Sequence, residues 1–167
     1  MLAALGCAAI AGLMPTVTSP AAALANCTWG QAKLSGQVSG ATQSLLGTLT
    51  LTNRSGRACA LPVAPIRASL IIGSQVLPTL AVRMRGSVVP PGAPTRRLPR
   101  RGHVVVGIQW RNWCGAPRGK VRLSVALTIF SSVTSRASLG VVSTPPCGDR
   151  RFSSRVAVSR FLKPSAA

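Results

Sequence analysis

Apolar and polar residues alternate with a period of two along most of the chain after Leu45. Leu49 and Leu51 would face one side of a strand and Thr50 the other, and the turn-forming residues 53–56 follow. This pattern is typical of a half-buried strand that packs one face on a core. The same pattern predicts further strands at 66–72, 76–84, 104–110, 121–129, 139–143 and 156–162.

No segment shows the 3.6-residue apolar period of an amphipathic helix. About seven short strands separated by turns containing Gly and Pro predict an all-β fold, an antiparallel β-sandwich. Within the segment 76–84, Pro78 cannot donate a ladder hydrogen bond, so part of this segment is expected to lie at an edge or a bulge. No repeat or linker divides residues 26–167, which are therefore expected to form one domain.

The first 25 residues have the composition of an export signal. Leu2–Met14 is an apolar run, and Ala23–Ala25 offers the small-x-small pattern that signal peptidases cleave. The apolar run is too short to cross a bilayer, so no transmembrane span is expected. We predict that residues 1–25 are a signal peptide and that the mature domain acts in the extracellular space or on the cell envelope. Lipid attachment at Cys7 is the alternative.

The predicted mature domain contains an even number of cysteines, which favours two disulfides in an exported protein. The four residues are Cys27, Cys59, Cys114 and Cys147. None belongs to a C-x-x-C pair and the chain has one histidine, so a zinc site is not expected. Three pairings are possible. We favour Cys27–Cys59 with Cys114–Cys147, each closing a loop that would contribute about 3–4 kcal/mol.

Charge limits the chemistry that the chain can perform. Twenty Lys and Arg residues stand against one acidic side chain, Asp149, and the formal net charge is +19. Paired carboxylates and carboxylate metal cages cannot be assembled from a single Asp. No glycine-rich nucleotide motif follows a predicted strand, so we expect no cofactor and no enzymatic activity. A serine hydrolase using His103 and Asp149 is the weakest alternative, because the chain lacks a G-x-S-x-G elbow.

Arginine-rich segments are the best candidates for contact with an anionic partner. Residues 88–103 hold four prolines and four arginines, and they are expected to form an extended, solvated loop without strands. A loop that is solvated and binds nothing is an equal alternative. The candidate anion-binding residues are Arg96, Arg97, Arg100, Arg101, Arg150 and Arg151.

Residues 110–114 read W-R-N-W-C at the end of a predicted strand. Alternation along the strand would place Trp110 against the core and Trp113 on the opposite surface of the sheet. A tryptophan beside a disulfide is a familiar packing unit in sandwiches, and Asn112 is expected to satisfy backbone groups at the strand end. In the alternative interpretation, Trp113 and Arg111 form an exposed ligand platform.

The order and spacing of several motifs carry a family resemblance. L-T-N-R-S-G occupies residues 51–56, Cys59 follows it, and W-R-N-W-C and the late Cys147 come downstream. Over residues 27–161 this pattern resembles a family of exported domains of unknown function that is common in GC-rich Gram-positive bacteria. The resemblance implies an immunoglobulin-like sandwich on the cell envelope, often lipid-anchored, and implies no catalytic activity. The chain differs from that pattern in its low acid content and its poor lipobox.

These observations predict an exported, non-catalytic module that contacts anionic cell-wall polymer or lipid headgroups. A basic protein that binds nucleic acid non-specifically is the alternative. It is weakened by the scarcity of aromatic residues, because the chain has no Tyr, three Phe and three Trp with which to stack bases.

Overall fold

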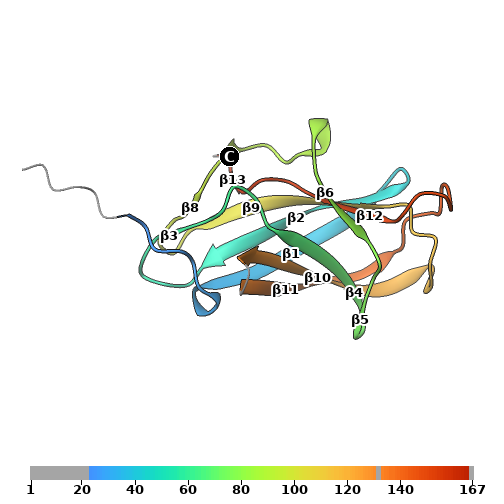
Figure 1. Cartoon of the computed structure of the whole chain (residues 1–167), viewed down its shortest axis with the longest axis horizontal. Helices are drawn as coiled ribbons and strands as arrows, with labels where there is room; N and C mark the ends of the chain where they lie inside the picture. The colour runs from blue at the N-terminus through green and yellow to red at the C-terminus, as the bar shows by residue number, and fades with distance from the viewer. Residues whose placement is uncertain (1–22, 131–132, 166–167) are drawn as a thin grey trace, which may run out of the picture.

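Two β-sheets face each other across one apolar core (Figure 1). The computed structural model describes residues 23–130 and 133–165. The larger sheet follows the spatial order β1 (Ala32–Ala41), β2 (Ser44–Asn53), β9 (His103–Arg111), β12 (Arg155–Val158) and β6 (Leu80–Arg83), with β13 (Leu162–Lys163) and β7 (Ala93–Pro94) attached beside β9. The smaller sheet follows the order β11 (Val133–Ser143), β10 (Lys120–Phe130), β4 (Arg67–Ile72) and β5 (Gln75–Val76).

The remaining elements are short. β3 (Cys59–Ala60) pairs with β8 (Arg97–Leu98) in a separate two-stranded ladder. Two single-turn 3₁₀ helices, η1 (Trp29–Gln31) and η2 (Gly86–Val88), complete the fold. None of the helices in the described part of the chain is long and apolar enough to cross a membrane.

Apart from the two-residue strands β5, β7 and β13, the strand order is that of an immunoglobulin constant-type sandwich with one strand added. Numbered A to G in chain order, strands β1, β2, β4, β6, β9, β10 and β11 form the sheets A-B-E-D and C-F-G. The additional strand β12 lies between β9 and β6, antiparallel to the first and parallel to the second. The prediction of an immunoglobulin-like β-sandwich is therefore confirmed, and a strand near the C-terminus widens its larger sheet.

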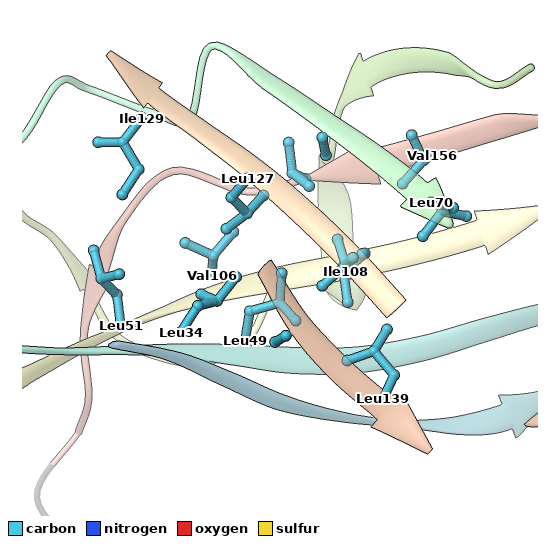
Figure 2. Packing of buried hydrophobic residues seen from close by; sticks show 14 of the residues in the cluster. Leu34, Leu49, Leu51, Leu70, Val106, Ile108, Leu127, Ile129, Leu139 and Val156 are labelled. Carbon is cyan, nitrogen blue, oxygen red and sulfur yellow. The ribbon is translucent and has the colours of Figure 1, made fainter. Parts of the chain in front are cut away.

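The core lies where the predicted alternation places apolar side chains. In β10, every second residue from Val121 to Ile129 is buried, with at most 7% of its surface exposed. Leu49 and Leu51 of β2 are fully buried and lie across the sandwich from β10. Figure 2 shows Leu49 and Ile108 of one sheet pointing toward the same space as Leu127 of the other.

Several strand predictions were incomplete: the segment 139–143 covers only part of β11, and the segment 156–162 spans most of β12 and the start of β13. β1 was not predicted, because its inward side chains, Leu34 and Val38, are separated by the small residue Gly36, which weakens the alternation. Pairing with β2 over its whole length makes it a strand. The segment 76–84 is divided at Pro78 into β5 and β6, as expected for a residue that cannot extend a ladder.

The prediction that residues 88–103 form a loop without strands was wrong. This segment contains β7 and β8, and Leu98 in β8 is fully buried. Leu98 pairs with Cys59 of β3. The Pro and Arg content of this region is typical of a solvated loop. The region is nevertheless ordered, because the apolar side chain of Leu98 is buried against a segment that is distant in sequence.

Both predicted disulfides are present. Cys27 is bonded to Cys59, and Cys114 to Cys147, with sequence separations of 32 and 33. The first is attached to β3 through Cys59, and the second joins the segment after β9 to the segment before β12. The predicted signal peptide, including Cys7, lies outside the described residues except for Ala23–Ala25, which are exposed.

Candidate anion-binding sites at the two ends of the sandwich

Strand β9 runs between two ends of the molecule that carry different candidate residues (Figure 1). Its nine residues, at about 3.4 Å per residue, separate His103 from Arg111 by about 27 Å. We call the end near His103 the Cys27–Cys59 end, and the end near Arg111 the Cys114–Cys147 end. Figure 1 shows β3 and β8 at the first end, and the connections after β9 and before β12 at the second.

The six predicted anion-binding arginines do not form one patch. The four from Arg96 to Arg101 lie at the Cys27–Cys59 end, where Arg97 pairs with Ala60. Arg150 and Arg151 lie at the opposite end, in the loop Gly148–Phe152 that contacts Asn112. Two separate surfaces are therefore available for contact with an anionic partner.

The same separation bears on the hydrolase alternative. His103 is an exposed residue at the start of β9. Asp149 lies in the loop that hydrogen-bonds to Asn112, directly beyond the other end of that strand. The only histidine and the only acidic side chain of the chain are thus not neighbours, so these two residues do not form the His–Asp pair of a catalytic triad.

Asn53 holds the arginine-rich segment against the end of β2. Its buried side chain donates hydrogen bonds through Nδ2 to the carbonyl oxygens of Pro99, at 3.0 Å, and Arg57, at 2.7 Å. Its Oδ1 accepts two more from the backbone N–H and the hydroxyl of Ser55, both at 2.8 Å. The backbone N–H of Asn53 also donates to the carbonyl of Gly102 at 2.8 Å. These bonds give Asn53 and Ser55 of the L-T-N-R-S-G motif a structural role.

The backbone that carries the four arginines is therefore fixed while their side chains remain in solvent. The carbonyl oxygen of Arg96 accepts a hydrogen bond from the N–H of Leu61 at 2.8 Å. Arg101 adopts a left-handed conformation with φ 51°. All four guanidinium-bearing residues of this segment are exposed: Arg96, Arg97, Arg100 and Arg101.

Asn112 performs the equivalent role at the Cys114–Cys147 end. Its Nδ2 donates to the carbonyl oxygens of Asp149 at 2.9 Å and Phe152 at 2.7 Å. Its Oδ1 accepts from the backbone N–H groups of Gly148 and Asp149, both at 3.0 Å. The predicted role of Asn112, satisfying backbone groups at a strand end, is confirmed. The amide organises the Gly148–Phe152 loop.

The predicted orientation of Trp113 was wrong. Asn112 has φ 58°, a left-handed conformation that ends the alternation of β9. As a result Trp110 and Trp113 are both buried, with 1% and 3% exposure, and their ring centroids lie 5.6 Å apart. Their indole N–H groups donate to Ser154 Oγ at 2.9 Å and to the carbonyl of Pro117 at 2.8 Å. Trp113 is therefore a core residue and cannot form an exposed platform with Arg111.

The single acidic side chain is neutralised inside its own loop. The Asp149 carboxylate accepts three contacts from the Arg151 guanidinium, at 2.9 to 3.2 Å, and one from the Arg151 backbone N–H at 2.8 Å. The Arg151 side-chain hydrogen bonds, followed by the backbone one, lower the pKa of Asp149 below its usual 3.8. Arg151 is thus a partner of Asp149, which leaves Arg150 as the free cation of this predicted pair of residues.

This ion pair sets the expected response to acid. Because the folded-state pKa of Asp149 is lowered, its contribution to stability is complete above pH 3.8 and is lost as the pH falls through the folded value. We expect the melting temperature of wild type to change little between pH 9 and 5 and to fall slightly at lower pH, and Asp149→Asn to remove that fall. Thermal unfolding from pH 2 to 9 measures both. An equal acid-induced fall in the variant would contradict this assignment.

A hollow at the Cys114–Cys147 end contains residues that the sequence did not single out as anion-binding. It has a volume of about 490 Å³, and its walls include Gln43, Arg111, Phe152 and Arg155. Arg111 is exposed and follows the buried Trp110, so the two residues lie on opposite faces of β9. The alternating sequence pattern indicates this outward position of Arg111. The proximity of Arg155 to Arg111 has no signal in the sequence, because it depends on the pairing of β12 with β9.

No group of three His, Cys, Asp or Glu residues in residues 23–130 and 133–165 is arranged to hold a metal ion. No protein-family model, curated protein or solved structure matches the chain. The resemblance to exported envelope domains thus stays a prediction.

Proposed function

We propose that this domain acts outside the cytoplasm as a non-catalytic module that binds an anionic surface of the cell envelope, either a wall polymer or lipid headgroups. The observation that carries the proposal is the large excess of exposed arginines over anions. Within the described residues the only ion pair joins Arg151 to Asp149. The four arginines from Arg96 to Arg101 therefore have no carboxylate partner there, and their charge is available to a ligand.

The location outside the cytoplasm is supported by the two disulfides. Disulfides persist in oxidising compartments and are rare where thiol reductants are maintained. The +19 formal charge supports an anionic partner, because a surface of one sign attracts polyanions and repels copies of itself.

The arginine-rich segment is the best single contact surface because its backbone is held in place. Asn53 fixes it through Pro99, and Leu98 anchors it in the core. A segment whose backbone is already ordered loses less conformational entropy when it binds than a mobile one. Each arginine brought to an anionic surface contributes about 1 kcal/mol at moderate ionic strength.

Binding of single-stranded nucleic acid has weaker support. Such binding combines positive charge with exposed aromatic rings on which bases stack. Of Trp110, Trp113, Phe130, Phe152 and Phe161, only Phe152 is exposed. Among these residues, therefore, only one exposed aromatic ring is available for base stacking, whereas single-strand binding uses several.

Removal of four charges from the arginine-rich segment tests the proposal. The variant carries Ser at Arg96, Arg97 and Arg100, and Asn at Arg101 because Asn tolerates the left-handed conformation. At about 1 kcal/mol per residue, we expect affinity for phosphatidylglycerol-containing vesicles or for wall fragments to fall by about 10³-fold. Co-sedimentation at low salt measures retention, and wild-type binding should weaken as salt is added.

The matched control removes four charges from the outer face of the smaller sheet. It replaces Arg67, Lys120, Arg122 and Arg136 with Ser; all four residues are exposed. We expect this control to retain most of the binding. If both variants lost the same amount of affinity, binding would depend on the net charge of the protein and the arginine-rich segment would have no special role. Failure of wild type to bind either anionic surface would overturn the proposed function, as would tighter binding to single-stranded DNA than to both.

A further inference from the structure

The hollow at the Cys114–Cys147 end combines features that distinguish it from the rest of the basic surface. It lies beside the β1–β2 turn, the last residue of β9 and the first residue of β12. Its volume of about 490 Å³ is within the range of about 300–1,000 Å³ that is typical of small-molecule sites. A smaller hollow of about 170 Å³ shares Gln43, Arg111, Asn112 and Gly148 with it and continues along Gln109.

Two arginines lie side by side in this hollow. Arg111 and Arg155 are directly opposite each other in the antiparallel pairing of β9 with β12, and both are exposed. Side chains at such positions have Cβ atoms about 4.5–5.5 Å apart, and like charges placed there repel each other. Neither arginine has an ion pair within the described residues. Asp149 also lines the hollow, but its carboxylate is bound by Arg151.

An exposed aromatic ring stands next to the two arginines. Phe152 is 58% exposed and lines the hollow together with both arginines. Its carbonyl accepts a hydrogen bond from Asn112 Nδ2 at 2.7 Å, and its N–H donates to the carbonyl of Asp149 at 3.3 Å. The backbone of Phe152 is therefore held in place, and the residue lines the wall of the hollow.

Polar groups complete the walls. Gln43 and Ser153 line the hollow and bring an amide and a hydroxyl that can both donate and accept hydrogen bonds. Gln43, like Asn112, has a left-handed backbone conformation, with φ 59°. Two of the three non-glycine residues with positive φ in the described chain thus line one hollow. Such conformations concentrate at ligand-binding sites, where the surrounding structure maintains them.

We infer that this hollow binds a sugar ring that carries one carboxylate or phosphate group. Arg111 and Arg155 bind the oxyanion through bidentate hydrogen bonds, because planar guanidinium groups match the spacing of carboxylate and phosphate oxygens. The apolar face of the sugar lies on Phe152, and its hydroxyl groups meet Gln43 and Ser153. This inference rests on the proposed function and deepens it, because it names the unit of an anionic polymer that one site recognises.

Titration with monosaccharides tests the inference. Glucuronate and glucose 1-phosphate carry the two oxyanions, whereas glucose lacks the charge and inorganic phosphate lacks the ring. Chemical-shift changes of backbone amides are followed in ¹⁵N-labelled protein, with Gly148 and Phe152 as local reporters. We expect saturable shifts with at least one acidic sugar, and binding by glucose and by inorganic phosphate that is weaker by about tenfold or more. The preferred acidic sugar identifies the oxyanion source.

Three variants assign the roles of the side chains. Arg111→Gln and Arg155→Gln should each weaken binding of the acidic sugar by about tenfold or more, because one charge-assisted contact is lost. Phe152→Ser should weaken the acidic sugar and leave inorganic phosphate unchanged. Arg122→Gln, an exposed position on the other sheet, is the matched control and should have no effect. Arg111→Gln and Arg155→Gln should also raise the melting temperature at low salt, because the like-charge repulsion is removed.

The outcomes separate this inference from the proposed function. If the protein binds anionic vesicles or wall fragments but no acidic monosaccharide, the hollow is not the site and the surface function remains. Equal loss in Arg122→Gln and Arg111→Gln would also overturn the inference, since general electrostatic attraction would then explain binding. A lower melting temperature in Arg111→Gln and Arg155→Gln would show that these arginines serve the fold.

Discussion

Removal of both disulfides is expected to unfold most of the domain. The two bonds close loops with sequence separations of 32 and 33, and each contributes about 3–4 kcal/mol in the chain-entropy model. Their joint loss of about 7 kcal/mol is comparable with the 5–15 kcal/mol by which proteins of this kind are usually stable. The chain also repels itself, because a +19 formal charge with one acidic side chain leaves little to compensate it.

Urea denaturation with and without a reductant measures this effect. The variants Cys27→Ser/Cys59→Ser and Cys114→Ser/Cys147→Ser remove one bond each and should each lower stability by about 3–4 kcal/mol. The variant without Cys114–Cys147 should also lose order in the Gly148–Phe152 loop, which lies next to that bond. A fully reduced protein with an unchanged urea midpoint would contradict the prediction. A stable reduced form would also remove one support for function outside the cytoplasm.

Substitution of the buried Asn53 or of the half-buried Asn112 should have the next largest effect. Asn53→Ala and Asn112→Ala each delete an amide that makes four side-chain hydrogen bonds. Each leaves backbone groups without their partners, and a buried polar group without a partner costs about 1–3 kcal/mol. We expect Asn53→Ala to lose about 3 kcal/mol of unfolding free energy and Asn112→Ala about 1 kcal/mol, because water can reach the loop groups that Asn112 binds; urea denaturation measures both.

The consequences for binding differ between the two ends. Asn53→Ala should weaken retention on anionic surfaces although every arginine remains, because the segment held through Pro99 is released. Asn112→Ala should weaken binding of the acidic sugar, because the loop that carries Phe152 is released. Asn26→Ala is the matched control, since Asn26 is exposed, and its stability should change by less than about 0.5 kcal/mol. Unchanged retention by Asn53→Ala would show that the charges act without an ordered backbone.

The strands and the disulfides could be predicted because their signals are local or chemically narrow. The inward residues of β10 alternate over one continuous segment, so the period of two is visible without knowledge of any partner. The four cysteines of the domain allow three pairings, of which the expected one is present. The pairing of Asp149 with Arg151 is also local, since the two residues are two positions apart in the sequence.

The candidate sites depend on contacts between segments far apart in the chain. The insertion of β12 between β9 and β6 places Arg155 beside Arg111, 44 positions earlier. Asn112 reaches a loop 36 to 40 residues away, and its left-handed backbone turns Trp113 into the core.

The alternating pattern of the sequence by itself determined that this chain forms a β-sandwich, and its composition determined that the surface is positive. Only the tertiary structure decided that the arginines divide between two ends and that two of them meet in one hollow. The physical reason is that the alternation of a strand depends only on its own residues. Which strands pair with it in a sheet depends on the packing of the whole core.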